Sequence, residues 1–216
     1  ITVGTSQAII LPTSIRSFRS HLAKGAPDTN LLIEWILWVP RGVIIASATV
    51  AYVSGATLRL IFGCMAIIIA IKMLANRQNW QIANDLPSKV GRSIAGMTIG
   101  LISAFMGIGG GNLNTAFMTT YGRPIHQAVA TSAGLGTLIA LPGMIGYIYA
   151  GWQHPDLPPF SLGFVSLFGV ALIMPTSLWA APLGAKLAHG LDKRTMEIAF
   201  GIFLLLVATR MFWSVL

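Results

Sequence analysis

The chain has 216 residues, of which 55% are hydrophobic and only 9% are Asp, Glu, Lys or Arg, and its mean hydropathy is +0.74. A soluble domain carries about 25% charged residues, so this chain cannot cover itself with water-compatible side chains, and we expect the lipid bilayer to be its main solvent. The net charge of +8 does not indicate a nucleic-acid partner, because the basic residues stand at the ends of apolar runs rather than on one polar face.

Apolar runs of about 20 residues, the length that crosses a bilayer, divide the chain into seven expected spans. No run shows the period-two alternation of barrel strands, so the expected class is all-α, a polytopic membrane protein. In chain order the spans are Ile1–Leu22, Leu31–Ser54, Leu58–Leu74, Ser93–Met106 with Leu113–Tyr121, Pro124–Ala150, Ser161–Trp179 and Thr195–Val215. Gly107–Gly111 interrupts the fourth span, and a short amphipathic stretch, Pro182–Leu191, precedes the last.

The chain repeats itself weakly. Residues 2–6 (TVGTS) resemble residues 128–132 (AVATS), and at the same offset Gly25 matches Gly151. The first three spans and the last three are therefore expected to be two copies of one unit, with the Gly-rich span in front of the second copy. The Gly-rich hairpin of the first copy is expected to precede Ile1. The predicted domains are 1–75 as the first repeat, 76–92 as a cytoplasmic linker and 93–216 as the second repeat.

The basic residues predict the orientation, since Lys and Arg collect in cytoplasmic loops. All of them can lie inside if the Gly-rich span enters from the cytoplasm, turns at Gly107–Gly111 and returns as a re-entrant hairpin. The two repeats are then inverted, and the loop Gly151–Pro159, which has no Lys or Arg, is external. Inverted repeats with a broken helix near the midplane are a common transporter plan. The basic residues used are Arg16, Arg19, Lys24, Arg77, Lys89, Arg92, Arg123, Lys186, Lys193 and Arg194.

The glycine run is the strongest local signal, with four glycines in the five positions of Gly107–Gly111. Each glycine disfavours a helix interior by about 1 kcal/mol relative to Ala, so the helix should break there. Asn112 and Asn114 stand where the helix resumes, and Asn is a favoured N-cap. The new helix would direct unpaired N–H groups and its positive dipole end at the break, which suits an anion. Tight helix packing through small residues explains the same glycines equally well.

Two Thr-Ser pairs occupy equivalent places in the two repeats, Thr5-Ser6 and Thr131-Ser132. Their hydroxyls could donate to an oxyanion near the pseudo-twofold axis, or bond back to their own helices. The recurrence of the pair in both repeats makes the two interpretations equally strong.

Charged and titratable residues inside the spans are few. Arg41 and Glu34 lie seven residues apart on one helix face, so Arg41 could pair with Glu34 or attract the substrate anion. His21 and His126 lie near the inner ends of their spans, where they could relay protons or cap the helix. The predicted substrate-binding residues are Gly109, Gly110, Gly111, Asn112, Thr131, Ser132, Thr5, Ser6 and Arg41.

The sequence carries no enzyme or metal signature. It has no His-Glu-x-x-His zinc site, no Gly-x-Ser-x-Gly elbow and no Walker loop. A single cysteine, Cys64, excludes an internal disulfide and a thiolate metal site, and few acidic residues are available for a hard metal cation. We therefore expect no enzymatic activity, no cofactor and no metal.

These motifs carry a resemblance to a known family. Gly107–Gly111, followed by Gly122–Ser132 (GRPIHQAVATS), resembles the second-repeat signature of the TauE/SafE family of sulfite and organosulfonate exporters, and Thr2–Ser6 is similar to its first-repeat partner. The resemblance covers nearly the whole chain. It implies a multi-pass protein of the cell inner (plasma) membrane that moves small sulfur oxyanions or sulfonates outward. Asn114 and Thr115 stand where the family usually has an apolar residue and Pro, which leaves the identity of the anion open.

The resemblance, the helix break and the hydroxyl pairs favour a secondary transporter that exports a small anion such as sulfite, a sulfonate or a related sulfur oxyanion. Two other classes stay open. A passive anion channel would show unitary currents without proton coupling. A non-transporting scaffold subunit would tolerate bulky residues in the glycine run. The sequence also leaves open the coupling ion and assembly as a homo-oligomer.

Overall fold

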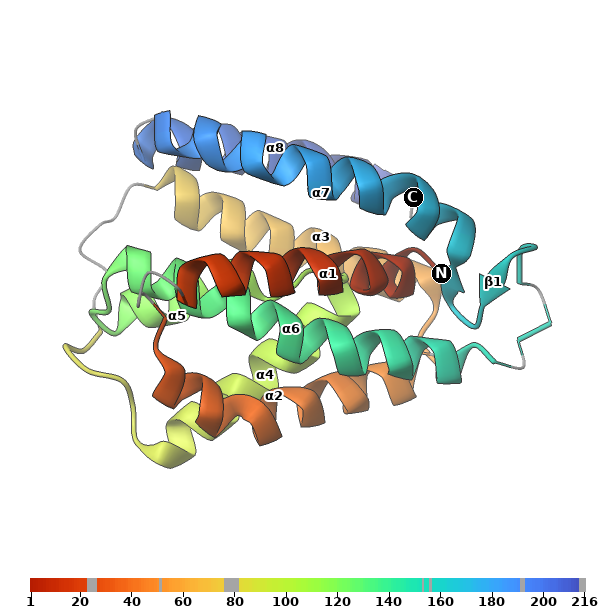
Figure 1. Cartoon of the computed structure of the whole chain (residues 1–216), viewed down its shortest axis with the longest axis horizontal. Coiled ribbons are helices and arrows are strands. Elements are labelled where there is room, and N and C mark those ends of the chain that lie inside the picture. Colours follow the sequence, from red (N-terminus) through yellow and green to blue (C-terminus); the bar gives the residue numbers. More distant parts are fainter. Residues whose placement is uncertain are drawn as a thin grey trace. The chain divides into compact units, whose positions relative to one another are not determined.

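The computed structural model of the protein describes residues 1–22, 27–50, 52–75, 82–152, 154–155, 157–190 and 193–213. This part of the chain consists of helices and one two-stranded hairpin, which confirms the predicted all-α class (Figure 1). In chain order the elements are α1 (Thr2–Leu22), α2 (Thr29–Val50), α3 (Gly55–Leu74), α4 (Lys89–Met106), α5 (Gly111–Thr120), α6 (Ile125–Ala150), β1 (Ser161–Leu162), β2 (Val165–Ser166), α7 (Leu167–Gly190) and α8 (Lys193–Trp213).

The helices follow the predicted spans, and the sixth span differs most. It is predicted from Ser161, but β1 and β2 pair there as an antiparallel hairpin and α7 begins at Leu167. The Ser166 hydroxyl accepts the N–H of Gly169 at 3.1 Å, so Ser166 caps the helix and sets its start. At its other end α7 continues to Gly190, through most of the stretch that is predicted as a separate amphipathic segment.

The helix lengths and the outward-facing residues suit a bilayer. Seven of the helices have 18–26 residues, and at about 1.5 Å per residue this is close to the thickness of the hydrocarbon core. Among the described residues, α2 and the segment Gln127–Ala150 of α6 also qualify as spans by apolar composition. Large apolar side chains point outward, as at Ile33 and Leu37 on α2, which are 65% and 62% exposed. A soluble protein rarely leaves so broad an apolar face uncovered.

The chain forms two compact units by close packing. Unit 1 comprises Ile1–Ala51 and Gln81–Ser177, and unit 2 comprises Tyr52–Trp80 and Leu178–Leu216. Each unit takes helices from both predicted repeats. The division therefore follows packing and does not test the predicted domains, which stay a prediction.

In unit 1, α4 packs on α2 almost backbone to backbone. A Cβ atom on Gly100 would collide with the carbonyl oxygen of Val39, and one on Gly42 would collide with the backbone of α4. Trp35 of α2 is fully buried, and its Nε1 donates to the carbonyl of Arg92 at 2.8 Å. These contacts make α2 a close-packed support for α4.

One charge pair joins the same two helices and rules out one of the two roles suggested for Arg41, its pairing with Glu34. The guanidinium of Arg92 binds both carboxylate oxygens of Glu34, at 2.7 and 2.8 Å. The Glu34–Arg41 pair is therefore wrong, because Arg92 at the start of α4 reaches Glu34 directly, whereas Arg41 lies two helical turns away. Arg41 is exposed, and its guanidinium carbon lies 4.6 Å from the ring centroid of Trp38.

In unit 2, α3 and α8 pack through apolar side chains, three of them alanines. The buried residues in this contact are Ala66, Ala70, Leu204 and Ala208. The Arg194 guanidinium donates to the carbonyl of Leu74 at 2.8 Å, which satisfies a carbonyl at the end of α3.

Replacing Gly100 by Ala should lower the free energy of unfolding by about 1–3 kcal/mol, because the backbone of Val39 cannot give way to a methyl group. Thermal unfolding of the full-length protein in detergent, followed by tryptophan fluorescence, measures this change. The control Thr98→Ala, on the exposed side of α4, should change the stability by less than about 0.5 kcal/mol. Equal midpoints for the two variants would contradict the close contact of α4 with α2.

Candidate functional site

α4 and α5 form a hairpin in which the start of α4 lies near the end of α5 (Figure 1). Before α4, the N–H of Ile82 donates to the carbonyl of Thr120, the last residue of α5, at 2.9 Å. Just past α5, the Arg123 guanidinium binds Asp85 at 2.8 Å. The chain therefore enters and leaves this element at one end, and the glycine run forms the turn at the other. Its placement in a bilayer as a re-entrant element stays a prediction.

The first half of the turn ends α4 through Gly107. Its backbone is left-handed, with φ +66°, a conformation that glycine adopts without steric cost. Its N–H donates to the carbonyl of Ala104 at 3.3 Å, and the N–H of Ile108 donates to the carbonyl of Ser103 at 3.2 Å. This pair of bonds is the Schellman motif, which satisfies carbonyls that the end of a helix leaves free.

The second half of the turn starts α5 at Gly110. This residue is the N-cap, with φ +69°, and its carbonyl accepts the N–H of Asn114 at 2.9 Å. The predicted Asn caps are wrong, because the left-handed backbone favours glycine, and Asn112 and Asn114 lie inside the helix. The first-turn N–H groups of residues 111–113 have no acceptor within the described part of the chain. The positive end of the α5 dipole is therefore directed at the turn.

Helix α1 closes one side of the turn. A Cβ atom on Gly107 would lie 3.2 Å from Cα of Val3 and 3.5 Å from Cβ of Ser6. A Cβ atom on Gly109 would lie 3.1 Å from Cγ2 of Ile10. Because Val3, Ser6 and Ile10 recur at helical spacing, one face of α1 covers the turn.

Helix α6 closes the other side, and here the glycines differ. Gly110 is tightly packed, since a Cβ atom would collide with the end of the Ile139 side chain and lie 3.0 Å from the hydroxyl of Ser103. A Cβ atom on Gly111 would meet nothing nearer than Cβ of Ser132, at 3.9 Å. The α5 N-terminus at Gly111 therefore has room beside it. At position 110, by contrast, both the close packing and the left-handed backbone require glycine.

Ser132 is the polar link between α5 and α6. The amide Nδ2 of Asn114 donates to its hydroxyl at 2.8 Å, and the Thr115 hydroxyl lies 3.0 Å away. Two carbonyls can take the Ser132 proton, that of Ala128 at 2.8 Å and that of Gly111 at 3.1 Å. The last contact places the Ser132 hydroxyl directly beside the first turn of α5.

The threonines of the two Thr-Ser pairs each accept a backbone N–H just before the start of another helix. Thr131 accepts the N–H of Asp28 at 2.8 Å, one residue before α2, and Thr5 accepts the N–H of Ser166 at 2.9 Å, one residue before α7. Each threonine donates its own proton to a carbonyl four residues back in its helix, at 2.8 and 2.9 Å. All four hydroxyls donate to carbonyls of their own helices, and the two serines differ in that they lie beside the turn.

The remaining predicted residues lie away from the turn or outside the described part. Arg41 is exposed on α2. His21 is half-buried in the last turn of α1. The side chain of His126 is outside the described part, as are Lys24 and Arg77.

Two polar side chains near the turn are not singled out by the sequence analysis. Gln7 on α1 and Ser103 on α4 are fully buried. Neither amide atom of Gln7, nor the Ser103 hydroxyl, has a hydrogen-bond partner within the described residues. An amide inside an apolar helix is the signal that could have found Gln7. Serine is common in membrane helices, so the sequence gives no comparable signal for Ser103.

The segments that form the turn and its flanking helix faces carry no charged side chain. The sequence has no Asp, Glu, Lys or Arg in residues 1–15, 93–122 or 127–150, which supply the turn and most of α1 and α6. An anion bound here would meet backbone N–H groups, hydroxyls and amides. Within the described ranges, no three His, Cys, Asp or Glu side chains come together as a metal site requires.

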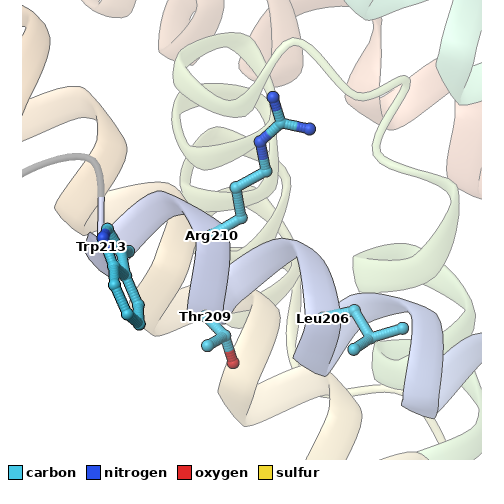
Figure 2. A pocket seen from close by; sticks show the side chains of 4 residues that line it. All are labelled: Leu206, Thr209, Arg210 and Trp213. Atoms are coloured by element: carbon cyan, nitrogen blue, oxygen red, sulfur yellow. The ribbon is translucent and has the colours of Figure 1, made fainter.

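A separate shallow cavity of about 460 Å³ lies on α8 in unit 2. Figure 2 shows the four side chains that line it, Leu206, Thr209, Arg210 and Trp213. Leu206 and Trp213 are largely exposed, so the cavity belongs to the outward apolar face of α8 and not to an enclosed site.

Comparisons with known proteins cover all of these elements. A family model described as sulfite exporter TauE/SafE matches residues 1–211. The chain is also similar to a probable membrane transporter protein of Haemophilus influenzae (strain Rd), with 31% identity over 210 residues, which are 97% of this chain and 80% of that protein. No solved structure matches the chain. The family match includes the turn and its flanking helices α1 and α6.

Replacing Ser132 by Ala should lower the free energy of unfolding by about 1–3 kcal/mol, because the buried amide of Asn114 would lose its closest acceptor and keep only contacts at 3.5 Å. The control Ser6→Ala should cost less than about 0.5 kcal/mol, since the Ser6 hydroxyl bonds only its own helix, to the carbonyl of Thr2 at 3.0 Å. Chemical or thermal unfolding in detergent separates the two variants. A larger loss for Ser6→Ala would contradict the assigned role of Ser132.

Proposed function

Because the chain belongs to the sulfite exporter TauE/SafE family of membrane transporters, we propose that it is a secondary transporter of a small anion: sulfite, a sulfonate or a related sulfur oxyanion. It works as a multi-pass protein of the cell inner membrane and moves the anion outward.

The observation that carries this proposal is the uncharged helix start at Gly111. The N–H groups of residues 111–113 have no acceptor in the described part of the chain, and they stand beside space that a glycine leaves free. Such a helix N-terminus binds an anion without a fixed positive charge. Broken helices that direct N-termini at anionic substrates are a recurrent feature of transporters.

The proposed site consists of groups that contact the anion and groups that position the helices carrying them. Gly109–Gly111 and Asn112 supply backbone N–H groups. Ser6 and Ser132 supply hydroxyls from the flanking helices, and each hydroxyl must turn from a carbonyl of its own helix to donate to the anion. Thr5 and Thr131 position those helices through the starts of α7 and α2. Arg41 lies outside the proposed site, because its exposed side chain stacks on Trp38.

Neutral ligand groups suit a carrier. The empty site must reorient across the membrane, and an unpaired buried Lys or Arg would oppose that step, since its desolvation costs several kcal/mol. Backbone N–H groups at a helix end retain a favourable potential for the anion and need no counter-ion when the site is empty.

The inverted arrangement of the two repeats is also part of the proposal. It is supported by the reciprocal threonine bonds: α1 of the first predicted repeat caps α7 of the second, and α6 of the second caps α2 of the first. Asp28 and Ser166, the two residues so bonded, each accept the N–H three residues further on, both at 3.1 Å. A pseudo-twofold axis between α1 and α6 generates such a pair of contacts.

Progressively larger side chains at residue 111 should progressively lower the transport rate and finally abolish transport. In the series Gly111→Ala, Gly111→Val and Gly111→Leu, the fold should be retained, because a Cβ atom meets only Ser132 at 3.9 Å, while the growing side chain displaces the anion. Uptake of sulfite, thiosulfate, sulfoacetate, sulfate and carboxylates into proteoliposomes with the full-length protein measures the loss.

Thermal midpoints of the same variants serve as the control for folding. Wild-type rates in Gly111→Leu would place the anion site elsewhere. Unitary currents in planar bilayers, in place of saturable uptake, would identify a passive channel.

Cysteine labelling tests the topology. Single cysteines in residues 83–89 should react only from the cytoplasmic side, and cysteines at Trp152 or Pro158 only from the outside, because the re-entrant hairpin keeps the basic loops inside. Impermeant maleimide on right-side-out and inside-out vesicles makes the distinction. Reaction of both loops from one side would refute the inverted plan.

A further inference from the structure

Asn114 is a fully buried amide that is satisfied on one side only. Its Nδ2 donates to the Ser132 hydroxyl at 2.8 Å, and its two other contacts, with the carbonyl of Ala128 and the sulfur of Met118, are long, at 3.5 Å. Its Oδ1 has no hydrogen-bond partner among the described residues. An apolar side chain would avoid this unpaired oxygen, so stability alone does not explain an asparagine at this position.

Thr115, the next residue of α5, approaches the same hydroxyl. Its Oγ1 lies 3.0 Å from Oγ of Ser132. A serine hydroxyl has one proton and two lone pairs. Two carbonyls can take the Ser132 proton, that of Ala128 at 2.8 Å and that of Gly111 at 3.1 Å. Because the proton goes to a carbonyl, Thr115 must be the donor in its contact with Ser132.

Asn114 and Thr115 together therefore occupy both lone pairs of the Ser132 hydroxyl. Toward a ligand beside Gly111, this hydroxyl can then act only as a hydrogen-bond donor. Ser132 is also the residue that a Cβ atom on Gly111 would meet first among the described residues, at 3.9 Å. The oxygens of a sulfonate or of sulfite are acceptors, so a hydroxyl that is restricted to donating matches them, whereas a cation would find no free lone pair.

The two bonds also strengthen and position the donor. A hydroxyl that accepts hydrogen bonds becomes a better donor, because each incoming bond polarises its O–H group. This effect has weight here, since residues 93–122 and 127–150 contain no charged side chain. Asn114 and Thr115 belong to α5, the helix whose first N–H groups are directed at the turn. They therefore hold the hydroxyl of α6 in place relative to those N–H groups.

We propose that Asn114, together with Thr115, is a positioning residue for the transported anion, which it does not touch: it keeps the Ser132 hydroxyl as a donor directed at the helix start. This inference rests on the proposed transport function and adds residues that act on the same site through Ser132. When the anion enters, the Ser132 proton turns from its carbonyl to the anion, while both lone pairs keep their donors.

The first test replaces Asn114 by Leu, which has the same number and branching of heavy atoms but no hydrogen-bonding group. Initial rates of sulfite and methanesulfonate uptake into proteoliposomes with the full-length protein give the half-saturating concentration and the maximal rate. The half-saturating concentration should rise about two- to tenfold for both anions, with the maximal rate nearly unchanged. A merely structural role would lower the thermal midpoint and leave the half-saturating concentration as in the wild type.

A double-mutant cycle tests whether Asn114 acts through Ser132. Ser132→Ala should raise the half-saturating concentration about ten- to a hundredfold, because it removes a donor to a charged ligand. Adding Asn114→Leu to Ser132→Ala should then change it less than about twofold, since the hydroxyl that Asn114 positions is gone. If Asn114→Leu fails to fold, Asn114→Ala takes its place in the cycle, with the same expected result.

Thr115→Val tests the second donor and has a matched control on the same helix. It should raise the half-saturating concentration by a similar factor, about two- to tenfold. Thr120→Val should leave that concentration unchanged, because the Thr120 hydroxyl bonds only the carbonyl of Ala116 in its own helix, at 2.7 Å. Thermal midpoints of all variants separate a loss of binding from a loss of folding.

The failure of this inference is distinguishable from the failure of the proposed function. Wild-type half-saturating concentrations in the folded Asn114 variants would overturn the inference while transport itself stands. Independent, multiplying losses in the double-mutant cycle would do the same, because Asn114 would then act without Ser132. If the wild type takes up neither sulfite nor methanesulfonate, the proposed function fails, and this inference fails with it.

Discussion

The rest of the structure depends on one constraint, that backbone groups freed by a helix break must find partners where lipid is the solvent. At the end of α4 the Schellman bonds at Gly107 satisfy the free carbonyls, and α1 and α6 close over the turn. At the start of α5 the N–H groups of residues 111–113 have no acceptor among the described residues, and space lies next to Gly111. The break is thus closed on one side and available to a ligand on the other.

The same constraint explains the contacts around the turn. The first N–H groups before α2 and α7 need acceptors, and the buried hydroxyls of Thr131 and Thr5 supply them. Each bond joins a helix start to α6 or α1, the two helices that line the turn. The ion pair of Glu34 and Arg92 fixes the start of α4 on α2. The hairpin of α4 and α5 is therefore held at the end opposite the glycine turn. A ligand at the turn would therefore contact helices from both predicted repeats.

The sequence predicts the helices and the break well, because run length and glycine content are local properties. It fails where tertiary contacts decide. Arg92 is far from Glu34 in the chain, so the pair is invisible to spacing arguments, and the left-handed backbone at Gly110 overrides the Asn preference for a cap. The hairpin that delays α7 is too short to leave a pattern of alternation. Gln7 is visible in the sequence as an amide in an apolar helix, but its lack of partners is a tertiary property that the sequence does not show.

The central claim is that an anion binds at the uncharged turn between α4 and α5. Anomalous scattering from selenium locates it most directly, in crystals of the full-length protein soaked with selenite. We predict a difference peak within hydrogen-bonding distance of the N–H groups of Gly111 and Asn112, beside Ser132. A peak beside Arg41 or Arg210, with none at the turn, would contradict the account.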